Sequence, residues 1–229
     1  MVLFDRPPVT LNVIGSADEA MVRRVYCIGR NYLAHVREMN NDEREPPFYF
    51  MKPVDALVVG GGDAAYPPAT EDLHHEVELA LVIGGAGFQV SEASAPGLIF
   101  GITVAVDFTR RDRQAEAKKM GRPWEPGKAF DGSCPIGAVL PVAAAAAVMP
   151  RALTLTLNGE TRQAGSSGDM IWSSAEIIAH ISQLNRLEPG DVILTGTPAG
   201  VGPVVPGDRL VATADGVPPL TVTCQPAVA

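Results

Sequence analysis

The sequence predicts a β-rich α+β domain with a few short helices. Its 23 glycines and 20 prolines are spread along 229 residues, which favours many short strands joined by turns over a helical bundle. Hydrophobic residues make up 46% and charged residues 19%, a balance typical of a protein that buries a core. We therefore expect an N-terminal extension at 1–21 and one domain at 22–229.

Apolar segments of strand length recur along the chain and are separated by turn residues. Asn158-Gly159 and Asp215-Gly216 each lie between two such segments, which predicts a hairpin at each site. The most apolar strands are expected at 75–84 and 98–107, and others at 22–28, 48–51, 56–59, 153–157, 161–163, 192–195, 209–214 and 220–224.

Capping and breaking residues predict the helices. A helix from Thr109 to about residue 120 would end at Gly121, and a helix at 175–184 would begin after Ser173 or Ser174. Asn31 can cap a further short helix at 32–39.

Charge and cysteine usage exclude several classes of protein. The net charge of −8 argues against nucleic acid or an anionic membrane as a partner. No apolar run reaches the roughly 18–20 residues that a membrane span needs, and the N-terminus lacks the pattern of a signal peptide. Cys27, Cys134 and Cys224 form no CxxC pair, so we expect reduced thiols in a cytoplasmic protein.

Three acidic residues lie on two apolar segments. Glu76 and Glu78 are two apart on a predicted strand, so their side chains leave the same face, where ionising both is costly without a cation. Asp107 follows the next apolar strand, at a junction where functional groups are common. Alternatively, the glutamates lie on a solvated edge and Asp107 caps the helix from Thr109. Together, the three predict a site for one Mg²⁺ or Mn²⁺ ion.

A histidine and a glutamate suggest acid–base chemistry. His35 and Glu38 are three apart and share a face if the segment is helical, so the carboxylate could help the imidazole take a proton from water. From the spacing alone, an incidental pair on an exposed helix explains them as well.

The segment from Thr109 onward has a local excess of cations, which suits an acidic substrate. A solvated helix face explains most of these residues, which are Arg110, Arg111, Arg113, Lys118, Lys119 and Arg122. Lys128 differs because it lies in a turn with apolar neighbours, where a partly buried ammonium could neutralise an enolate. The glycine-rich turn at 195–202 offers backbone N–H groups to an anion but has no nucleotide-binding spacing.

These pieces, in this order, resemble the fumarylacetoacetate hydrolase (FAH) family over residues 22–210. The resemblance rests on Gly29-Arg30-Asn31-Tyr32 with His35 and Glu38; Phe50-Met51-Lys52-Pro53; His74-His75-Glu76-Val77-Glu78-Leu79; Asp107 with Thr109-Arg110-Arg111-Asp112 and Gln114; Lys128 with Phe130-Asp131; Asn158-Gly159; and Leu194-Thr195-Gly196-Thr197-Pro198 with Gly200-Val201-Gly202.

The resemblance implies the family's mixed β-sandwich roll, a homodimer, and one Mg²⁺ or Mn²⁺ held by Glu76, Glu78 and Asp107 in each active site. It also implies that His35 and Glu38 activate water and that Lys128 stabilises an enolate. Substrate contacts would come from Arg30, Arg111, Gln114 and Thr197.

Residues 110–124 look most like the bacterial fumarylpyruvate hydrolases of gentisate-type aromatic degradation. The expected reaction is hydrolysis of a C–C bond in a 2,4-diketo acid (an acylpyruvate), giving fumarate and pyruvate from fumarylpyruvate. The alternatives are an oxaloacetate decarboxylase, an isomerase or decarboxylase of ring-cleavage products, and a non-catalytic protein that binds a keto acid or a metal.

Overall fold

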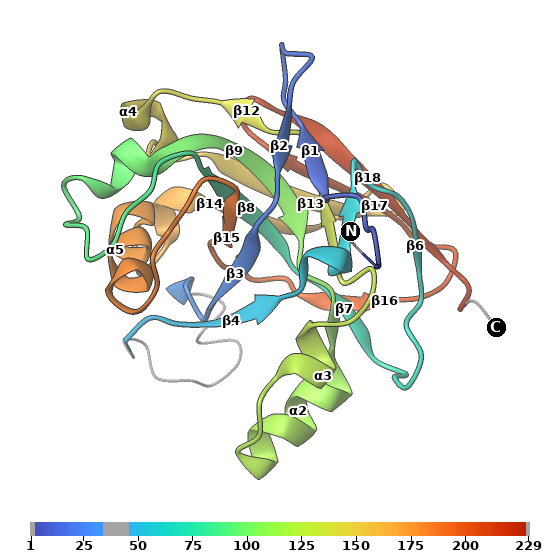
Figure 1. Cartoon of the computed structure of the whole chain (residues 1–229). Coiled ribbons are helices and arrows are strands. Elements are labelled where there is room, and N and C mark those ends of the chain that lie inside the picture. The colour runs from blue at the N-terminus through green and yellow to red at the C-terminus, as the bar shows by residue number, and fades with distance from the viewer. Residues whose placement is uncertain (1–2, 34–45, 228–229) are drawn as a thin grey trace.

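The computed structural model describes residues 3–33 and 46–227, and two sheets form most of that part (Figure 1). The larger, eight-stranded sheet is mixed, because β15 runs parallel to β3 and antiparallel to β8. In sheet order its strands are β4 (Phe48–Lys52), β3 (Arg24–Gly29), β15 (Asp191–Leu194), β8 (Val77–Ile83), β9 (Ile99–Val106), β11 (Cys134–Ile136) and β5 (Leu57–Val59), with β12 (Leu140–Pro141) paired to β9.

The second sheet has five strands and packs against the first, with β17 and β18 in contact with β9. Its order is β14 (Glu160–Ser166), β13 (Ala152–Leu157), β17 (Arg209–Ala214), β18 (Val217–Gln225) and β6 (Gly62–Ala65). Both predicted hairpins are present. In the first turn Asn158 and Gly159 have φ of 52° and 86°, the positive values that a type I′ turn needs.

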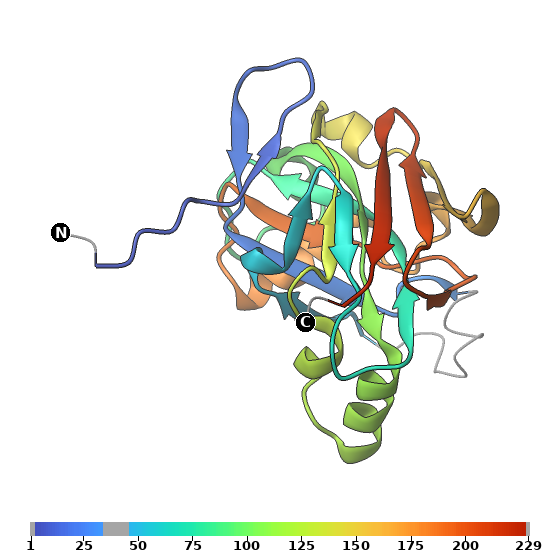
Figure 2. The ribbon, with the colours of Figure 1, turned by 90° about the vertical axis from the view of Figure 1, so that its right-hand side faces the viewer.

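Two smaller groups of strands complete the sheets. A three-stranded sheet contains β10 (Thr109–Arg110), β7 (Leu73–His75) and β16 (Gly202–Val204), and a hairpin contains β1 (Thr10–Asn12) and β2 (Glu19–Met21). The loop that joins its two strands projects from the molecule in both views (Figures 1 and 2), while Leu11 of β1 is buried in the core.

The helices are short and lie outside the sheets (Figure 1). Ser173 caps α5 and forms a capping box with Glu176. Of the two serines predicted as possible caps, Ser173 is therefore the correct one. The α-helices are α2 (Arg111–Met120), α3 (Glu125–Lys128), α4 (Ala144–Ala147) and α5 (Ser174–Leu184), and the 3-10 helices are η1 (Val54–Ala56), η2 (Ala95–Leu98) and η3 (Ser167–Asp169). None of the described helices is long and apolar enough to cross a membrane.

Both faces of the eight-stranded sheet are buried, which explains why its central strands are continuously apolar. Every residue of β8 is buried, with Leu79 and Leu81 in one apolar cluster and Ala80 and Val82 in the other. Alternation places Glu78 on the Ala80 face, and Asp107 on the same face as Ala105, which also belongs to the second cluster. The apolar packing of that face therefore ends where the carboxylates begin.

One predicted strand is wrong in detail. Residues 75–84 do not form one strand, because β7 ends at His75 and β8 begins at Val77. The chain changes sheets at Glu76: β7 pairs with β10 and β16, whereas β8 pairs with β9 and β15. The carbonyl of Glu76 still accepts a hydrogen bond from the Asp107 N–H, so both carboxylates stay at the same end of the β8–β9 pair.

Candidate active site

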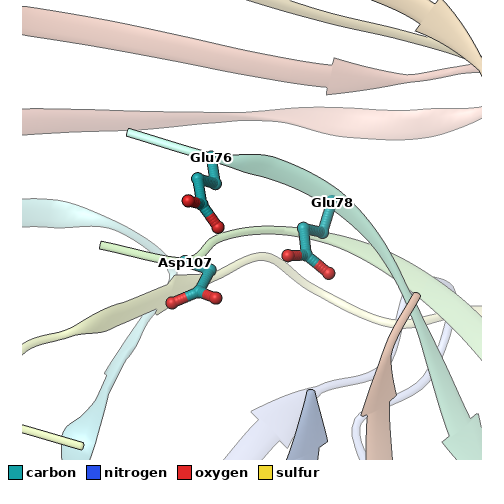
Figure 3. Close-up of side chains that lie close together, drawn as sticks. All are labelled: Glu76, Glu78 and Asp107. Atoms are coloured by element: carbon teal, nitrogen blue, oxygen red, sulfur yellow. The ribbon is translucent and has the colours of Figure 1, made fainter. Parts of the chain in front are cut away.

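The three predicted metal ligands converge at the ends of two neighbouring strands. Oxygen atoms of Glu76, Glu78 and Asp107 all lie within 4.8 Å of one another, and all three residues are buried. Their carboxyl groups surround a common space beside β8 and β9 (Figure 3). Asp107 is not a helix cap, since the N-cap position of α2 is Arg110. The solvated-edge and N-cap alternatives are therefore excluded.

Two buried lysines contact this cluster. Lys128 Nζ donates to Glu76 Oε2 at 2.8 Å and to Asp107 Oδ2 at 2.7 Å. Lys52 Nζ lies 2.9 Å from Asp107 Oδ1 and donates to Ser133 Oγ at 3.0 Å. Burial lowers the pKa of Lys128, but the carboxylates of Asp107 and Glu76 outweigh it, so the pKa is raised and the ammonium stays charged.

Helix α2 supplies two more polar groups to the same site. Arg111 donates to Glu76 Oε1 at 2.5 Å and to Gln114 Oε1 at 2.7 Å. Gly127 allows α3 to pack closely against α2, because a Cβ at that position would meet the Gln114 backbone N at 2.9 Å. This close approach brings Lys128, at the end of α3, beside the carboxylates.

Glu78 is held by a backbone group. Its Oε2 accepts a hydrogen bond of 2.5 Å from the Gly196 N–H, at a residue with φ of 98° where a Cβ would lie 2.8 Å from that of Asn31. The glycine-rich turn was predicted to offer its N–H groups to an external anion; this one binds a carboxylate of the protein itself. Burial, followed by Asp107 and Glu76, raises the pKa of Glu78 well above its usual range.

The donor set fits a hard divalent cation. Three buried carboxylates repel one another, and such a cation would stabilise their ionised forms. Asp107 Oδ1 supports this fit: among the described residues no hydrogen bond of acceptable geometry reaches this buried oxygen, although Lys52 Nζ is close. Lys128 already bridges two of the carboxylates, so the cluster attracts positive charge.

One pocket contains most of the residues predicted to form the site. It is lined by Glu76, Glu78, Asp107, Lys128, Arg30, Arg111, Gln114 and Thr197, together with Lys118, Trp124, Phe50, Ile28 and Gly29. His35 and Glu38 lie outside the described residues, so their predicted roles stay predictions.

The cation-rich segment divides into two parts. Arg111 and Lys118 line the pocket, and Lys118 Nζ lies 4.9 Å from the centre of the Trp124 ring. Arg113 faces outward, where it lies 3.4 Å from Glu116 and donates to the Ala69 carbonyl. The solvated-face alternative is thus correct for Arg113 and wrong for Arg111.

Two buried residues near the site were not singled out from the sequence. Lys52 was noted only within the family motif, yet its side chain is buried against Asp107. A lysine closing the apolar strand 48–51 is the signal that could have identified it, because lysine is rarely buried without a partner. Gln163 is fully buried and bonded to Thr197, and its position on a short hairpin strand gave no such signal.

Comparisons with known proteins agree with this geometry. Residues 24–225 match the domain family described as fumarylacetoacetate (FAA) hydrolase C-terminal. The chain belongs to the FAH family. The fold is also that of a fumarylpyruvate hydrolase from Pseudomonas aeruginosa solved with Mn²⁺ and pyruvate, at 43% identity and a TM-score of 0.93 over 100% of both chains. The predicted fold and family are confirmed.

Curated relatives in the FAH family carry two different activities. An oxaloacetate tautomerase of Escherichia coli is 44% identical over 196 residues, which cover 85% of this chain and 90% of the relative. A fumarylpyruvate hydrolase of Ralstonia sp is 42% identical over 183 residues, which cover 80% of this chain and 95% of the relative. The Mn²⁺ in the Pseudomonas structure agrees with the cofactor predicted from the acidic triad here.

Proposed function

We propose that this protein is a divalent-metal-dependent hydrolase that cleaves a C–C bond in a 2,4-diketo acid, with fumarylpyruvate giving fumarate and pyruvate. The observation that carries the proposal is the pocket in which Lys128 contacts two of three buried carboxylates. Such a pocket combines a site for a cation with an ammonium group beside it, as enolate stabilisation requires. The Pseudomonas and Ralstonia relatives support this choice of substrate.

We assign the following roles to the chain's own residues. Glu76, Glu78 and Asp107 would hold one Mg²⁺ or Mn²⁺, which supplies Lewis-acid polarisation of the substrate oxygens. Arg30, Arg111, Gln114 and Thr197 would bind and orient the keto acid. His35 and Glu38 would take a proton from water as its oxygen adds to the C4 carbonyl.

Lys128 would act in the bond-breaking step. As the C3–C4 bond breaks, its electron pair moves onto the pyruvate fragment and forms an enolate, while C4 becomes the new carboxylic acid. Lys128 is buried and charged beside Asp107, so its ammonium can neutralise the enolate before C3 takes up a proton.

The charge of the pocket favours substrates with two carboxylates. Arg30, Arg111, Lys118 and Lys128 line it together with the three acidic residues, and a bound divalent cation would add two further positive charges. A dianion offsets this excess better than a monoanion does. Fumarylpyruvate and oxaloacetate are both dianions, whereas acetylpyruvate is not.

Oxaloacetate chemistry is the second candidate, because the Escherichia coli tautomerase is as similar to this chain as the hydrolases are. Tautomerisation, like decarboxylation, passes through the enol or enolate of a 2-oxo acid and uses the same cation and Lys128. Decarboxylation needs neither an attacking water molecule nor a base, whereas tautomerisation moves a proton between C3 and the C2 oxygen and can use the same base. The His35–Glu38 pair therefore separates hydrolysis from decarboxylation.

A substrate panel tests the proposal. Fumarylpyruvate, maleylpyruvate, acetylpyruvate and oxaloacetate are each incubated with the Mg²⁺- or Mn²⁺-loaded protein, with pyruvate release and the enol–keto ratio followed together. We expect pyruvate from fumarylpyruvate. Faster keto–enol exchange of oxaloacetate with no cleavage of any diketo acid would instead establish the second candidate.

Changing Glu38 to Gln separates the steps. Hydrolysis is expected to fall by about 100-fold or more, in the range of a lost general base, while oxaloacetate decarboxylation keeps most of its rate. Glu92→Gln, at an exposed position, is the matched control. Equal loss of both activities would contradict the role of Glu38 in activating water.

We further infer, from the family resemblance, a cytoplasmic homodimer that acts in aromatic catabolism. Light scattering of the purified protein tests the dimer, because a monomer at micromolar concentration would contradict it.

A further inference from the structure

Gln163 connects the two sheets directly behind the pocket. It lies on β14 of the five-stranded sheet and is fully buried. Its Oε1 accepts from the Val77 N–H at 3.0 Å and pairs with His75 Nδ1 at 3.0 Å. Its Nε2 donates to Thr197 Oγ1 at 2.8 Å and to the Pro198 carbonyl at 2.9 Å. Both ends of the amide therefore have two partners, which is its full capacity.

The orientation of this amide is fixed by its neighbours. If it were reversed, its oxygen would face the Pro198 carbonyl and its NH₂ group would face the Val77 N–H, an unfavourable contact at each end. With the amide as described, His75 Nδ1 must carry the hydrogen that it shares with Gln163 Oε1.

Val77 explains why side chains make these bonds. It lies opposite Val106, next to the pair in which the Asp107 N–H bonds the Glu76 carbonyl, so by alternation its own N–H and C=O point away from β9. The register of β15 with β8 covers Ala80 to Val82 and does not extend to Val77. Gln163 therefore satisfies the N–H of Val77, and Thr197 Oγ1 donates to its carbonyl at 2.9 Å.

These contacts determine what the Thr197 hydroxyl can offer to a ligand. Its single hydrogen bonds the Val77 carbonyl, and one lone pair accepts from Gln163 Nε2. The second lone pair remains, and Thr197 lines the pocket with the three carboxylates. Turning the hydrogen into the pocket would break the bond to a carbonyl inside the protein, which is unfavourable. The oxygen can therefore accept a hydrogen bond from a ligand but cannot readily donate one.

We propose that Gln163 is a positioning residue that makes Thr197 a hydrogen-bond acceptor in the pocket, so that the site selects a 2-oxo acid in its enol form at this point. The enol hydroxyl can donate to Thr197 Oγ1, whereas a keto oxygen or a carboxylate would face a lone pair there. This inference rests on the proposed binding of 2-oxo acids. It applies directly to the tautomerase; in the hydrolase the C2 oxygen is a ketone when the C3–C4 bond breaks, so an enol would be bound at this point only after cleavage.

Lactate and pyruvate are suitable probes, because they have the same charge and differ mainly in carrying a hydroxyl donor or a keto acceptor at C2. Binding of each to the Mn²⁺-loaded protein is measured by calorimetric titration, and the ratio of Kd for lactate to Kd for pyruvate is the readout. We expect Thr197→Val to raise this ratio by about five- to tenfold, the effect of one lost hydrogen bond. Thr197→Ser keeps the hydroxyl, so its ratio should be close to that of the wild type.

A double-mutant cycle tests the role of Gln163 itself. Gln163→Met removes the bond that fixes Val77 through its N–H, so the Val77 carbonyl holds the Thr197 hydrogen less firmly, the hydrogen can turn toward pyruvate, and the ratio should again rise several-fold. In the Thr197→Val background the same change should leave the ratio as it is, because no hydroxyl remains. Gln183→Met, on the exposed face of α5, is the matched control.

The outcomes are distinct. Equal weakening of both ligands by Gln163→Met would mean a purely structural role and would overturn the proposal. If Gln163→Met does not fold, Thr197→Val decides, since an unchanged ratio there also overturns it. A wild-type protein that binds neither probe would overturn the proposed function and this inference together, whereas binding with unchanged ratios overturns the inference alone.

Discussion

Ion pairs occur in two contrasting settings in this protein. Arg113 and Glu116 pair on the outer face of α2, with side chains 44% and 50% exposed. Lys128 pairs with Glu76 and Asp107 at the strand ends, with side chains 3%, 7% and 1% exposed. Solvent screens the charges of the first pair. In the second setting the charges are buried, and each is stabilised by a neighbouring charge of opposite sign. Residue type alone does not distinguish the two settings. The difference is that the folded sheet excludes water from the second one.

The largest expected effect is that of Lys128→Met. Removing Lys128 takes one buried cation from both carboxylates and leaves Lys52 beside Asp107 and Arg111 beside Glu76, so the loss of folding free energy should approach about 3–5 kcal/mol, the cost of a broken buried ion pair. Urea denaturation of the metal-free protein measures this loss, and added Mn²⁺ should recover part of it. Lys119→Met, at an exposed position, is the control. Unchanged stability would mean that the buried pair contributes no more than the surface pair.

Glu78→Gln should have opposite effects with and without metal. Burial and the neighbouring carboxylates raise the pKa of Glu78, so in the metal-free protein its stabilising contribution is complete below the ordinary value of 4.5. That contribution is lost as the pH rises toward the raised value, and a neutral amide avoids the loss. At neutral pH the metal-free variant is therefore expected to be as stable as the wild type or more so.

With Mn²⁺ bound, the wild type should be more stable than Glu78→Gln. Saturation at 100 times Kd stabilises the wild type by about 2.7 kcal/mol, and the variant, which lacks one ligand, should lose most of this gain. Thermal unfolding with and without Mn²⁺ measures both effects. An equal metal-dependent shift in the two proteins would exclude Glu78 as a ligand.

Lys118 lies between the two settings, half-buried over Trp124. Burial, with Arg111 and Arg30 nearby, lowers its pKa to about 8. The ammonium is therefore lost as the pH rises through that value, and affinity for a dianion should fall. Titration of malate into the Mn²⁺-loaded protein from about pH 7 to about pH 9 should show a several-fold weakening that Lys118→Met removes. A variant that kept the wild-type pH dependence would assign it to another group.

The smallest effect is expected for Arg113→Ala. An exposed pair contributes about 0–1 kcal/mol, and this one lies outside the pocket. Stability and turnover should both stay close to those of the wild type. A loss of activity comparable to that of Lys128→Met would show that burial does not separate the two settings.

Local chemistry made part of the fold predictable. Asn158-Gly159 indicated its hairpin, and Ser173 or Ser174 indicated the start of α5, because both signals depend on neighbouring residues alone. The break at Glu76 was not predictable in this way. It depends on β10 and β16 pairing with β7, and those strands lie far from Glu76 in the sequence.

In the candidate site, too, local patterns were predictable and contacts between distant segments were not. Spacing and apolar context identified Glu76, Glu78 and Asp107, which the structure brings together. Family resemblance added Arg30, Gln114 and Thr197 to the pocket. Gln163 was missed, because its importance arises only when the second sheet packs behind β8, and no local pattern marks a polar residue that becomes buried in this way.

The Gln163 amide has a consequence for how the site forms. Glu78 lies on β8 of the eight-stranded sheet, and Glu76 and Asp107 directly adjoin β8 and β9, whereas the side chain that bonds both neighbours of Glu76 comes from the five-stranded sheet. The segment 76–107 transferred to another scaffold would carry the three carboxylates without this support. Metal affinity in this protein should therefore report whether the two sheets have docked, and a folding intermediate with only the larger sheet formed should bind metal weakly.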